Sequence, residues 1–444
     1  MSDISVLTLD DVKNAVAGTA AAFRRVVRLQ PAGGPGTKVF PPTYEGGKYA
    51  TEKRRINGEI VDCVLLDSVQ SQANRMELAL QEAIDEGRIS IPLIVVDFSS
   101  TRASFIGKIT SLEAPHRIAD AILRDSECED AQGNKIPFRQ SSAGEILNTA
   151  SPQNATELFR YCPTALVFGM WDSTSTRGGL GVKFPRVIVS EIIGVGAVPG
   201  QRTSSRLDPL QISSTAGPIY ETTDGDWTLD PAKAKRETDK QGKIVTDKSG
   251  NEIPVLYGKK KKGKPSEINH GNVTPSLVVQ KDKDGRPLDK SGRPTDRADE
   301  WIPIGGFTID YALQITLISL PALRRLRFPV NGGNADLPGR VALTALALCA
   351  ATLSGEKGYN LRSQCDLVPE DALHWELIGI KESKLYSLTS EQAIELFNKA
   401  VEEAKAAKLP WNSEPVKLSP REDLVELVLR SRERGGDEQG EEEE

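Results

Sequence analysis

The stretch from Val341 to Leu353 is apolar on every side and rich in alanine and leucine. A helix that is hydrophobic all round has to be buried, so this segment predicts a helix at the centre of a protein core. No run of apolar residues approaches the length that crosses a membrane, and we expect no membrane anchor. With 444 residues, the chain is long enough for one large domain or two to three average ones.

The rest of the chain predicts an α+β protein, with antiparallel strand pairs and helices on one side of the sheet. Apolar and β-branched runs predict strands at 22–29, 61–66, 91–98, 165–170, 182–193 and 307–320. Helical spacing and capping residues predict helices at 8–17, from Asp67 to about 86, and at 115–125, 143–149, 153–161, 390–408 and 421–430.

The segment 211–300 differs from its surroundings. It repeats the pattern D-K-x-G at Asp239, Asp247, Asp282 and Asp289, and tetrads of this kind form tight hairpin turns. Short apolar runs separate the turns, and K-K-K-K-G-K lies among them at 259–264. We therefore expect a lysine-rich β-ribbon arm and not a compact domain.

Charge is unevenly distributed along the chain. The net charge is −6, but residues 437–444 alone carry six acids and no base, which predicts a disordered acidic tail at 433–444. From Pro231 to Glu300 there are 17 bases against 11 acids. Five scattered cysteines and an N-terminus unlike a signal peptide predict a cytoplasmic protein with reduced thiols.

The predicted helix after Leu66 has an unusual start. Asp67 to Gln70 has the form of a capping box, and the first two turns then carry hydrogen-bonding side chains and Arg75 but no further carboxylate. Acids normally gather at a helix N-terminus, where the dipole is positive. A helix N-terminus without acidic side chains can bind an anion from another molecule, and phosphate is the obvious candidate. An ordinary capped helix is the alternative interpretation.

The sequence offers little for a catalyst. Its three histidines, His116, His270 and His374, have no metal-ligand spacing, and no phosphate-binding or hydrolase motif is complete. Asp97, at a strand end, is a possible lone catalytic carboxylate, although acids there are usually caps. We expect no enzyme, no cofactor and no metal.

Five segments resemble the backbone subunit of a type I-G CRISPR effector complex, the subtype formerly called I-U. They are V-L-L-D-S-V-Q-S-Q-A-N-R-M-E-L-A-L (64–80), F-G-M-W-D-S-T-S-T-R-G-G-L-G (168–181), F-P-R-V-I-V-S-E-I-I-G (184–194), R-T-S-S-R-L-D-P-L (202–210) and Y-N-L-R-S-Q-C-D-L-V-P (359–369). The resemblance runs in order from about Phe40 to Pro369. It departs from related subtypes at Ala73-Asn74, where those often have a lysine.

The resemblance implies a RAMP fold, with an RNA-recognition-motif-like (ferredoxin-like) palm, inserted finger elements and a β-hairpin thumb. Residues 1–210 and 301–388 would form the palm and fingers, 211–300 the candidate thumb and 389–432 the C-terminal helices. Such subunits polymerise along the guide RNA in antiviral defence and hold its heteroduplex with the target DNA strand, while base pairing supplies specificity. The implied partners are the CRISPR guide RNA, the target DNA strand, further copies of the chain, and the large and guide-processing subunits, without a membrane.

Basic, polar and aromatic residues are the chemistry of single-stranded nucleic-acid binding, and they cluster near the resembling segments. The residues expected to contact RNA are Lys38, Tyr44, Lys48, Arg54, Arg55, Gln70, Ser71, Gln72, Asn74, Arg75, Arg102, His116, Arg117, Trp171, Ser173, Thr174, Arg177, Lys183, Arg186, Arg202 and Arg206. Two alternatives remain: a subunit that cleaves RNA with a single acid, Asp97 or Asp172, and a scaffold that touches no nucleic acid.

Overall fold

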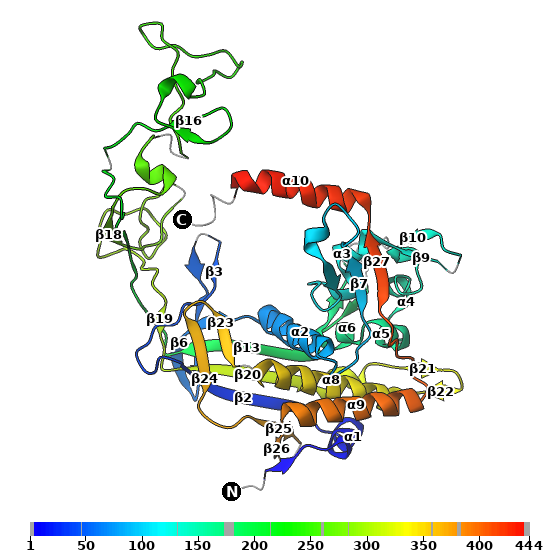
Figure 1. The fold of residues 1–444 in the computed structure, drawn as a ribbon. Coiled ribbons are helices and arrows are strands. Elements are labelled where there is room, and N and C mark those ends of the chain that lie inside the picture. Colours follow the sequence, from blue (N-terminus) through cyan, green and yellow to red (C-terminus); the bar gives the residue numbers. More distant parts are fainter. Residues whose placement is uncertain are drawn as a thin grey trace. The chain divides into compact units, whose positions relative to one another are not determined.

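The computed structural model describes residues 4–45, 47–130, 132–172, 182–213, 215–258, 262–282, 284–356, 358–379 and 383–438, with side chains up to residue 432. The chain divides into two compact units (Figure 1). Unit 1 comprises Met1–Pro42, Tyr49–Ala197 and Thr308–Glu444, and unit 2 comprises Thr43–Lys48 and Val198–Phe307. The predicted arm at 211–300 lies within unit 2.

A large mixed sheet is the centre of unit 1, so the α+β prediction is confirmed. Neighbouring strands along this sheet are antiparallel, except at one edge, where β1 runs parallel to β26. The strand order is β1 (Ser5–Val6), β26 (Ser383–Ser387), β25 (His374–Ile378), β2 (Ala22–Pro31), β20 (Tyr311–Ser319), β13 (Ile188–Val195), β6 (Glu59–Asp67) and β5 (Thr51–Ile56). In addition, β24 (Cys365–Pro369) pairs with β2 and with β23 (Tyr359–Arg362).

Helices α2 (Val69–Asp85) and α8 (Asp336–Glu356) pack on one face of this sheet, against β13 and β20 respectively. The core-helix prediction is confirmed, since every residue of α8 from Val341 to Leu353 is buried. Helix α9 (Ser390–Ala406) packs on α8 and runs alongside it in Figure 1. Its start has the predicted capping box, in which Thr389 and Gln392 bond each other's backbone.

By length and composition alone, α8 is also long and apolar enough to pass for a membrane span. In the structure 78% of its most apolar window is buried inside the protein. That is the environment of a core helix in a soluble protein, which passes the same composition test.

Unit 1 contains a second, five-stranded sheet to which the C-terminal region contributes. Its order is β10 (Lys135–Pro137), β9 (Ser126–Glu129), β27 (Val416–Pro420), β7 (Ile94–Asp97) and β8 (Lys108–Thr110). The central strand β27 runs parallel to β7 and antiparallel to β9. The chain then enters α10 (Glu422–Glu438), which begins one residue after the predicted start.

The other elements of unit 1 are short. The helices are α1 (Leu9–Ala17), α3 (Ala121–Arg124), α4 (Ile146–Thr149), α5 (Thr156–Tyr161), α6 (Pro163–Phe168) and α7 (Leu320–Arg324), with 3-10 turns at Ser104–Ile106, Arg117–Ala119 and Phe138–Gln140. The strand pairs are β11 (Met170–Trp171) with β12 (Lys183–Phe184), and β21 (Pro329–Val330) with β22 (Gly333–Asn334).

Several predicted elements differ in length from those in the structure, and two differ most clearly in type or extent. The expected strand at 165–170 is mostly helix α6, which Pro163 begins and which is buried throughout. A fully buried apolar run has no periodicity that separates strand from helix. The expected helix at 115–125 is a 3-10 turn followed by the single turn α3, because Asp120 caps a new helix there.

Unit 2 consists of short strand pairs and turns. The pairs are β15 (Thr203–Arg206) with β18 (Val273–Leu277), β16 (Tyr220–Glu221) with β17 (Trp227–Thr228), β3 (Thr43–Tyr44) with β4 (Lys48–Tyr49), and β14 (Val198–Pro199) with β19 (Phe307–Thr308). Two 3-10 turns lie at Pro231–Lys233 and Pro265–Ile268.

The four predicted D-K-x-G turns are confirmed in unit 2. At Asp239, Oδ1 accepts hydrogen bonds from the backbone N–H of Gln241 and Lys243, at 3.0 and 2.8 Å. The other three aspartates accept from the residues two and four positions later in the same way. The glycine of each tetrad has positive φ, which glycine adopts without strain.

Candidate nucleic-acid interface

The start of α2 lies where strand β6 ends. Ser68 is the N-cap, and its hydroxyl accepts a hydrogen bond from the backbone N–H of Ser71 at 3.2 Å. The predicted capping box from Asp67 to Gln70 is therefore wrong, because the cap is Ser68, whose side chain bonds the backbone N–H of Ser71. The first turn carries no acid, as expected, and the side chains of Gln70 and Asn74 are exposed.

The chain nevertheless supplies an anion of its own just before this helix. Asp67 is completely buried, and its carboxylate accepts from Ser71 Oγ at 2.7 Å and Gln72 Nε2 at 2.6 Å. Arg75 Nε donates to the same carboxylate at 2.9 Å. Asp67, which was expected to cap the helix, is therefore a binding partner inside this network instead.

Two arginines share this one carboxylate. Besides bonding Asp67, Arg75 donates to the backbone carbonyls of Asn360 at 3.2 Å and Leu361 at 2.6 Å. Arg362 Nη2 lies 3.6 Å from Asp67 Oδ1, while its Nη1 is buried and has no partner among the described residues. The single carboxylate of Asp67 faces two guanidinium groups, which leaves a surplus of positive charge next to the N-terminus of α2.

Sequence reasoning did not select Arg362. It lies at the end of β23, almost three hundred residues after Asp67, and no local pattern joins the two. The only signal was its place in the segment at 359–369 that carries part of the family resemblance.

A buried polar network holds α2 on the sheet. Gln72 Oε1 accepts from Ser190 Oγ at 3.0 Å and from Gln314 Nε2 at 2.8 Å. Gln314 in turn accepts from the hydroxyl of Tyr359 at 3.0 Å. Because Gln72 is buried and its amide is occupied on both sides, it positions the helix and does not present hydrogen-bonding groups to the surface.

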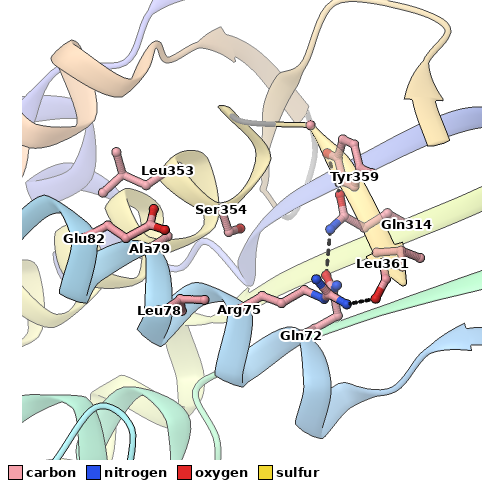
Figure 2. Close-up of a pocket in the computed structure, with 11 residues that line it drawn as sticks. Gln72, Arg75, Leu78, Ala79, Glu82, Gln314, Leu353, Ser354, Tyr359 and Leu361 are labelled. Atoms are coloured by element: carbon pink, nitrogen blue, oxygen red, sulfur yellow. Dashed lines mark hydrogen bonds between the residues drawn. The ribbon is translucent and has the colours of Figure 1, made fainter. Parts of the chain in front are cut away.

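A pocket of 140 Å³ opens beside this network, between α2, the end of α8 and β23 (Figure 2). Arg75 lies on its wall, so the pocket and the start of α2 share one residue. The residues that line it are Gln72, Arg75, Leu78, Ala79, Glu82, Gln314, Leu353, Ser354, Gly358, Tyr359 and Leu361.

Arg117 is buried and cannot reach a surface ligand in this arrangement. Its Nε and Nη2 donate to Glu77 at 2.6 and 2.7 Å, and Nη1 donates to the carbonyl of Gly169 at 2.9 Å. Burial raises the pKa of Glu77 to about 7, although the positive charge of Arg117 acts in the opposite direction. Burial also lowers the pKa of the half-buried Arg186, whose Nε has no described partner.

Two other predicted contacts in unit 1, Arg54 and Arg102, have carboxylate partners. Arg54 pairs with Glu191 at 2.6 Å and Arg102 with Glu422 at 2.5 Å. These hydrogen bonds raise the pKa of both arginines, and the two guanidiniums are less available to phosphate.

The remaining predicted residues of unit 1 that the structure describes are exposed. Arg55 bonds the carbonyl of Gly58, and Lys183 lies 5.8 Å from the ring centre of Trp171, which is 56% exposed. The side chains of Lys38 and His116 are also exposed. Ser173, Thr174 and Arg177 lie outside the described residues.

Four predicted contacts belong to unit 2. Tyr44 and Lys48 are exposed on β3 and β4, and Arg202 is exposed just before β15. Arg206 donates to the backbone carbonyls of Gly271 at 3.1 Å and His270 at 2.8 Å, which closes the end of the β15–β18 ribbon.

Residues 24–199 match the family model CRISPR-associated protein GSU0053 (Cas_GSU0053). This match supports a CRISPR-associated role for the chain. It covers the stretch from β2 to β14 and so includes Asp67, α2 and Arg117, but not Arg362 or β23. No curated protein matches the chain.

The two acids considered for a catalytic role have different surroundings. Asp172 is buried and forms a bidentate pair with Arg139 at 2.8 and 2.9 Å. Asp97 is partly exposed, and hydrogen bonds from the side chain and then the backbone N–H of Ser99, together with Lys108 at 3.6 Å, lower its pKa. Within the described part of the chain, no group of three potential ligands is placed to hold a metal ion.

Proposed function

We propose that the chain is a non-catalytic backbone subunit of a type I-G CRISPR surveillance complex that binds the guide RNA. The match over residues 24–199 supports the CRISPR association. The proposed RNA binding rests on the start of α2, where Arg75 and Arg362 share the single buried carboxylate of Asp67. Surplus positive charge beside a helix N-terminus suits a phosphate backbone.

In this proposal Asp67 has a positioning role. Its carboxylate and the carbonyls of Asn360 and Leu361 fix the Arg75 guanidinium, so little side-chain entropy is lost when a phosphate binds. The exposed side chains of Gln70 and Asn74 supply further hydrogen bonds. These contacts would be made to the sugar–phosphate backbone of the RNA, while base pairing between guide and target supplies sequence specificity.

The proposal extends to the architecture of the complex. The sheet with α2 and α8 would belong to the RAMP palm, and residues 211–300, which lie within unit 2, would form the thumb. Copies of the chain would polymerise along the guide and hold its heteroduplex with the target DNA strand. The large subunit and the guide-processing subunit would complete the complex in the cytoplasm.

The test is co-purification with RNA. The chain, expressed with its partner subunits and a guide array, should retain guide RNA, and binding of single-stranded RNA should weaken steeply with salt. Absence of RNA from both the isolated chain and the assembled complex at low salt would contradict the proposal and favour a scaffold that touches no nucleic acid.

A further inference from the structure

Side-chain contacts identify which face of the large mixed sheet lies away from α2 and α8. Gln72 of α2 bonds Ser190 of β13 and Gln314 of β20. Arg25 of β2 donates to the carbonyl of Ala351 in α8 at 2.7 Å. Successive side chains of a strand point to opposite faces of the sheet. The sequence neighbours of Ser190, Gln314 and Arg25 therefore lie on the face that these helices do not cover, which we call the open face.

Strand β20 carries apolar side chains in the middle of its open face and polar ones in the middle of its covered face. Leu313, Ile315 and Leu317 lie on the open face, whereas Gln314 and Thr316 lie on the covered face. An antiparallel sheet with one face in water normally has polar residues on that face, and strands that are apolar on both faces are typical of sheets covered on both. The sequence of β20 therefore indicates that another layer covers the open face.

The exposed apolar residues of the open face are contiguous. Val26 of β2 pairs with Ile315 of β20, and Leu317 of β20 pairs with Val189 of β13. Because Ile315 and Leu317 are two positions apart on one strand, the four side chains adjoin across three neighbouring strands. They are 37–51% exposed. Single apolar residues are normal on a surface, whereas a contiguous group such as this open-face patch marks an interaction site.

The arginines around the open-face patch already have carboxylate partners. The three pairs are Arg24 with Glu376 at 2.9 Å, Arg28 with Glu370 at 2.9 Å, and Arg54 with Glu191 at 2.6 Å. A phosphate backbone would have to break these pairs to gain a cation, so the open face is better suited to protein than to nucleic acid. The pairs carry no net charge, and two identical open faces therefore meet without like-charge repulsion.

We propose that the open-face patch is covered by the same patch of a second copy of this chain. Two sheets commonly stack face to face about 10 Å apart, with the side chains of both interdigitated. A surface that is apolar and has a neutral border is complementary to itself, and a two-fold contact of this kind closes at two copies. The contact is therefore separate from assembly along a guide RNA and does not depend on the proposed RNA binding.

Sedimentation equilibrium of the full-length chain tests this contact. The chain is freed of nucleic acid with nuclease and studied in about 0.5 M salt, which weakens association through RNA but not apolar contacts. A patch of four side chains is small, so we expect a weak dimer. The wild type should change from monomer to dimer between about 1 and 100 µM and form no larger species.

Variants at Val26 and Leu427 locate the contact. Val26→Lys puts a charge into the patch and should raise the dissociation constant of the dimer at least about tenfold. Leu427→Lys makes the matched change on α10, where Leu427 is 64% exposed and lies outside the patch, and should leave the dissociation constant unchanged. Val26→Glu alone should also be monomeric. An equimolar mixture of Val26→Lys and Val26→Glu should dimerise again, which misfolded variants could not do.

Four results would overturn the proposal. They are a wild type that stays monomeric at about 100 µM, association that continues beyond two copies, a dimer that survives Val26→Lys or is equally weakened by Leu427→Lys, and mixed Val26 variants that stay monomeric. None of these results bears on the proposed RNA binding, because RNA is absent from the experiment. A monomeric wild type that still retains guide RNA with its partner subunits would leave the proposed function intact.

Discussion

Asp67 is the residue on which the arrangement at the start of α2 depends. Its buried carboxylate bonds three side chains of α2 and attracts Arg362 from β23. A fully buried carboxylate such as that of Asp67 stays ionised only when it is paired with a positive charge and hydrogen-bonded. The same interactions that keep Asp67 stable therefore hold Arg75 in place.

Replacing Arg75 by alanine should affect both folding and binding. We expect Arg75→Ala to lower the free energy of unfolding by about 1–3 kcal/mol, because Asp67 loses its close charged partner. RNA affinity and assembly on the guide should fall as well. Urea unfolding and filter binding measure the two effects.

Arg160→Ala is the matched control for Arg75→Ala. Arg160 belongs to the same unit and pairs with Glu157 on the surface at 3.4 Å, so its loss should change stability by less than about 1 kcal/mol. Lys261→Ala should also change little beyond the salt dependence, but Lys261 lies outside the described residues. If Arg75→Ala behaves like Arg160→Ala in both assays, the proposed site is in the wrong place.

Glu77 makes stability depend on pH. Its pKa is raised from 4.5 to about 7, so between these values the folded chain holds a proton that the unfolded chain has released. Rising pH should therefore destabilise the wild type relative to Glu77→Gln, by on the order of 1–3 kcal/mol, with no further change above about pH 7. If the wild type instead becomes more stable than Glu77→Gln as pH rises, the positive charge of Arg117 affects the pKa of Glu77 more strongly than burial does.

At the scale of elements, β27 joins the C-terminal region to the middle of unit 1. Val416 and Leu418 pair with Ile94 and Val96 of β7, while Ser419 pairs with Glu127 of β9. The segment that was predicted only as C-terminal helices thus also contains the central strand of a sheet. Without β27, β7 and β9 would each have an unpaired edge.

Truncation after Lys408 tests the contribution of β27. We expect the shortened chain to unfold at a temperature at least about 10 °C lower and to aggregate, because two strand edges and the apolar contacts of Leu418 and Val425 become exposed. Removal of residues 439–444 alone should leave the midpoint unchanged. Equal midpoints for both truncations, measured by circular dichroism, would contradict this role.

At the scale of the whole molecule, unit 2 is an insertion between two adjacent strands. Val195 of β13 pairs with Tyr311 of β20, and the N–H of Asp310 donates to the carbonyl of Val195 at 2.9 Å. The two ends of unit 1 that flank residues 198–307 are therefore close together. The main core cluster of unit 1 contains no residue from this range.

Replacing residues 198–307 by a short glycine–serine turn should leave unit 1 folded. We expect the midpoint of thermal unfolding to stay within about 5 °C of that of the full chain, since a closed hairpin costs little entropy. RNA affinity should fall and its salt dependence should become shallower, because the surplus of bases in 231–300 is removed. An unfolded product would show that unit 2 contributes to the stability of unit 1.

The sequence by itself determined the features that depend on neighbouring residues. The capping box of α9 and the four D-K-x-G turns are each formed within a few residues, and the segment of α8 is apolar on every side, so local pattern was sufficient to predict these elements. The acid-free first turn of α2 was likewise visible in the sequence.

Only the tertiary structure decided what the charged side chains can do. Arg117 is hydrogen-bonded to Glu77, forty positions earlier in the sequence, and Arg362 lies 3.6 Å from Asp67, almost three hundred positions earlier. Whether 165–170 formed a strand or a helix also depended on what surrounds it. Burial and charge pairing are set by distant parts of the chain that come together only on folding, and a single sequence carries no periodic signal for them.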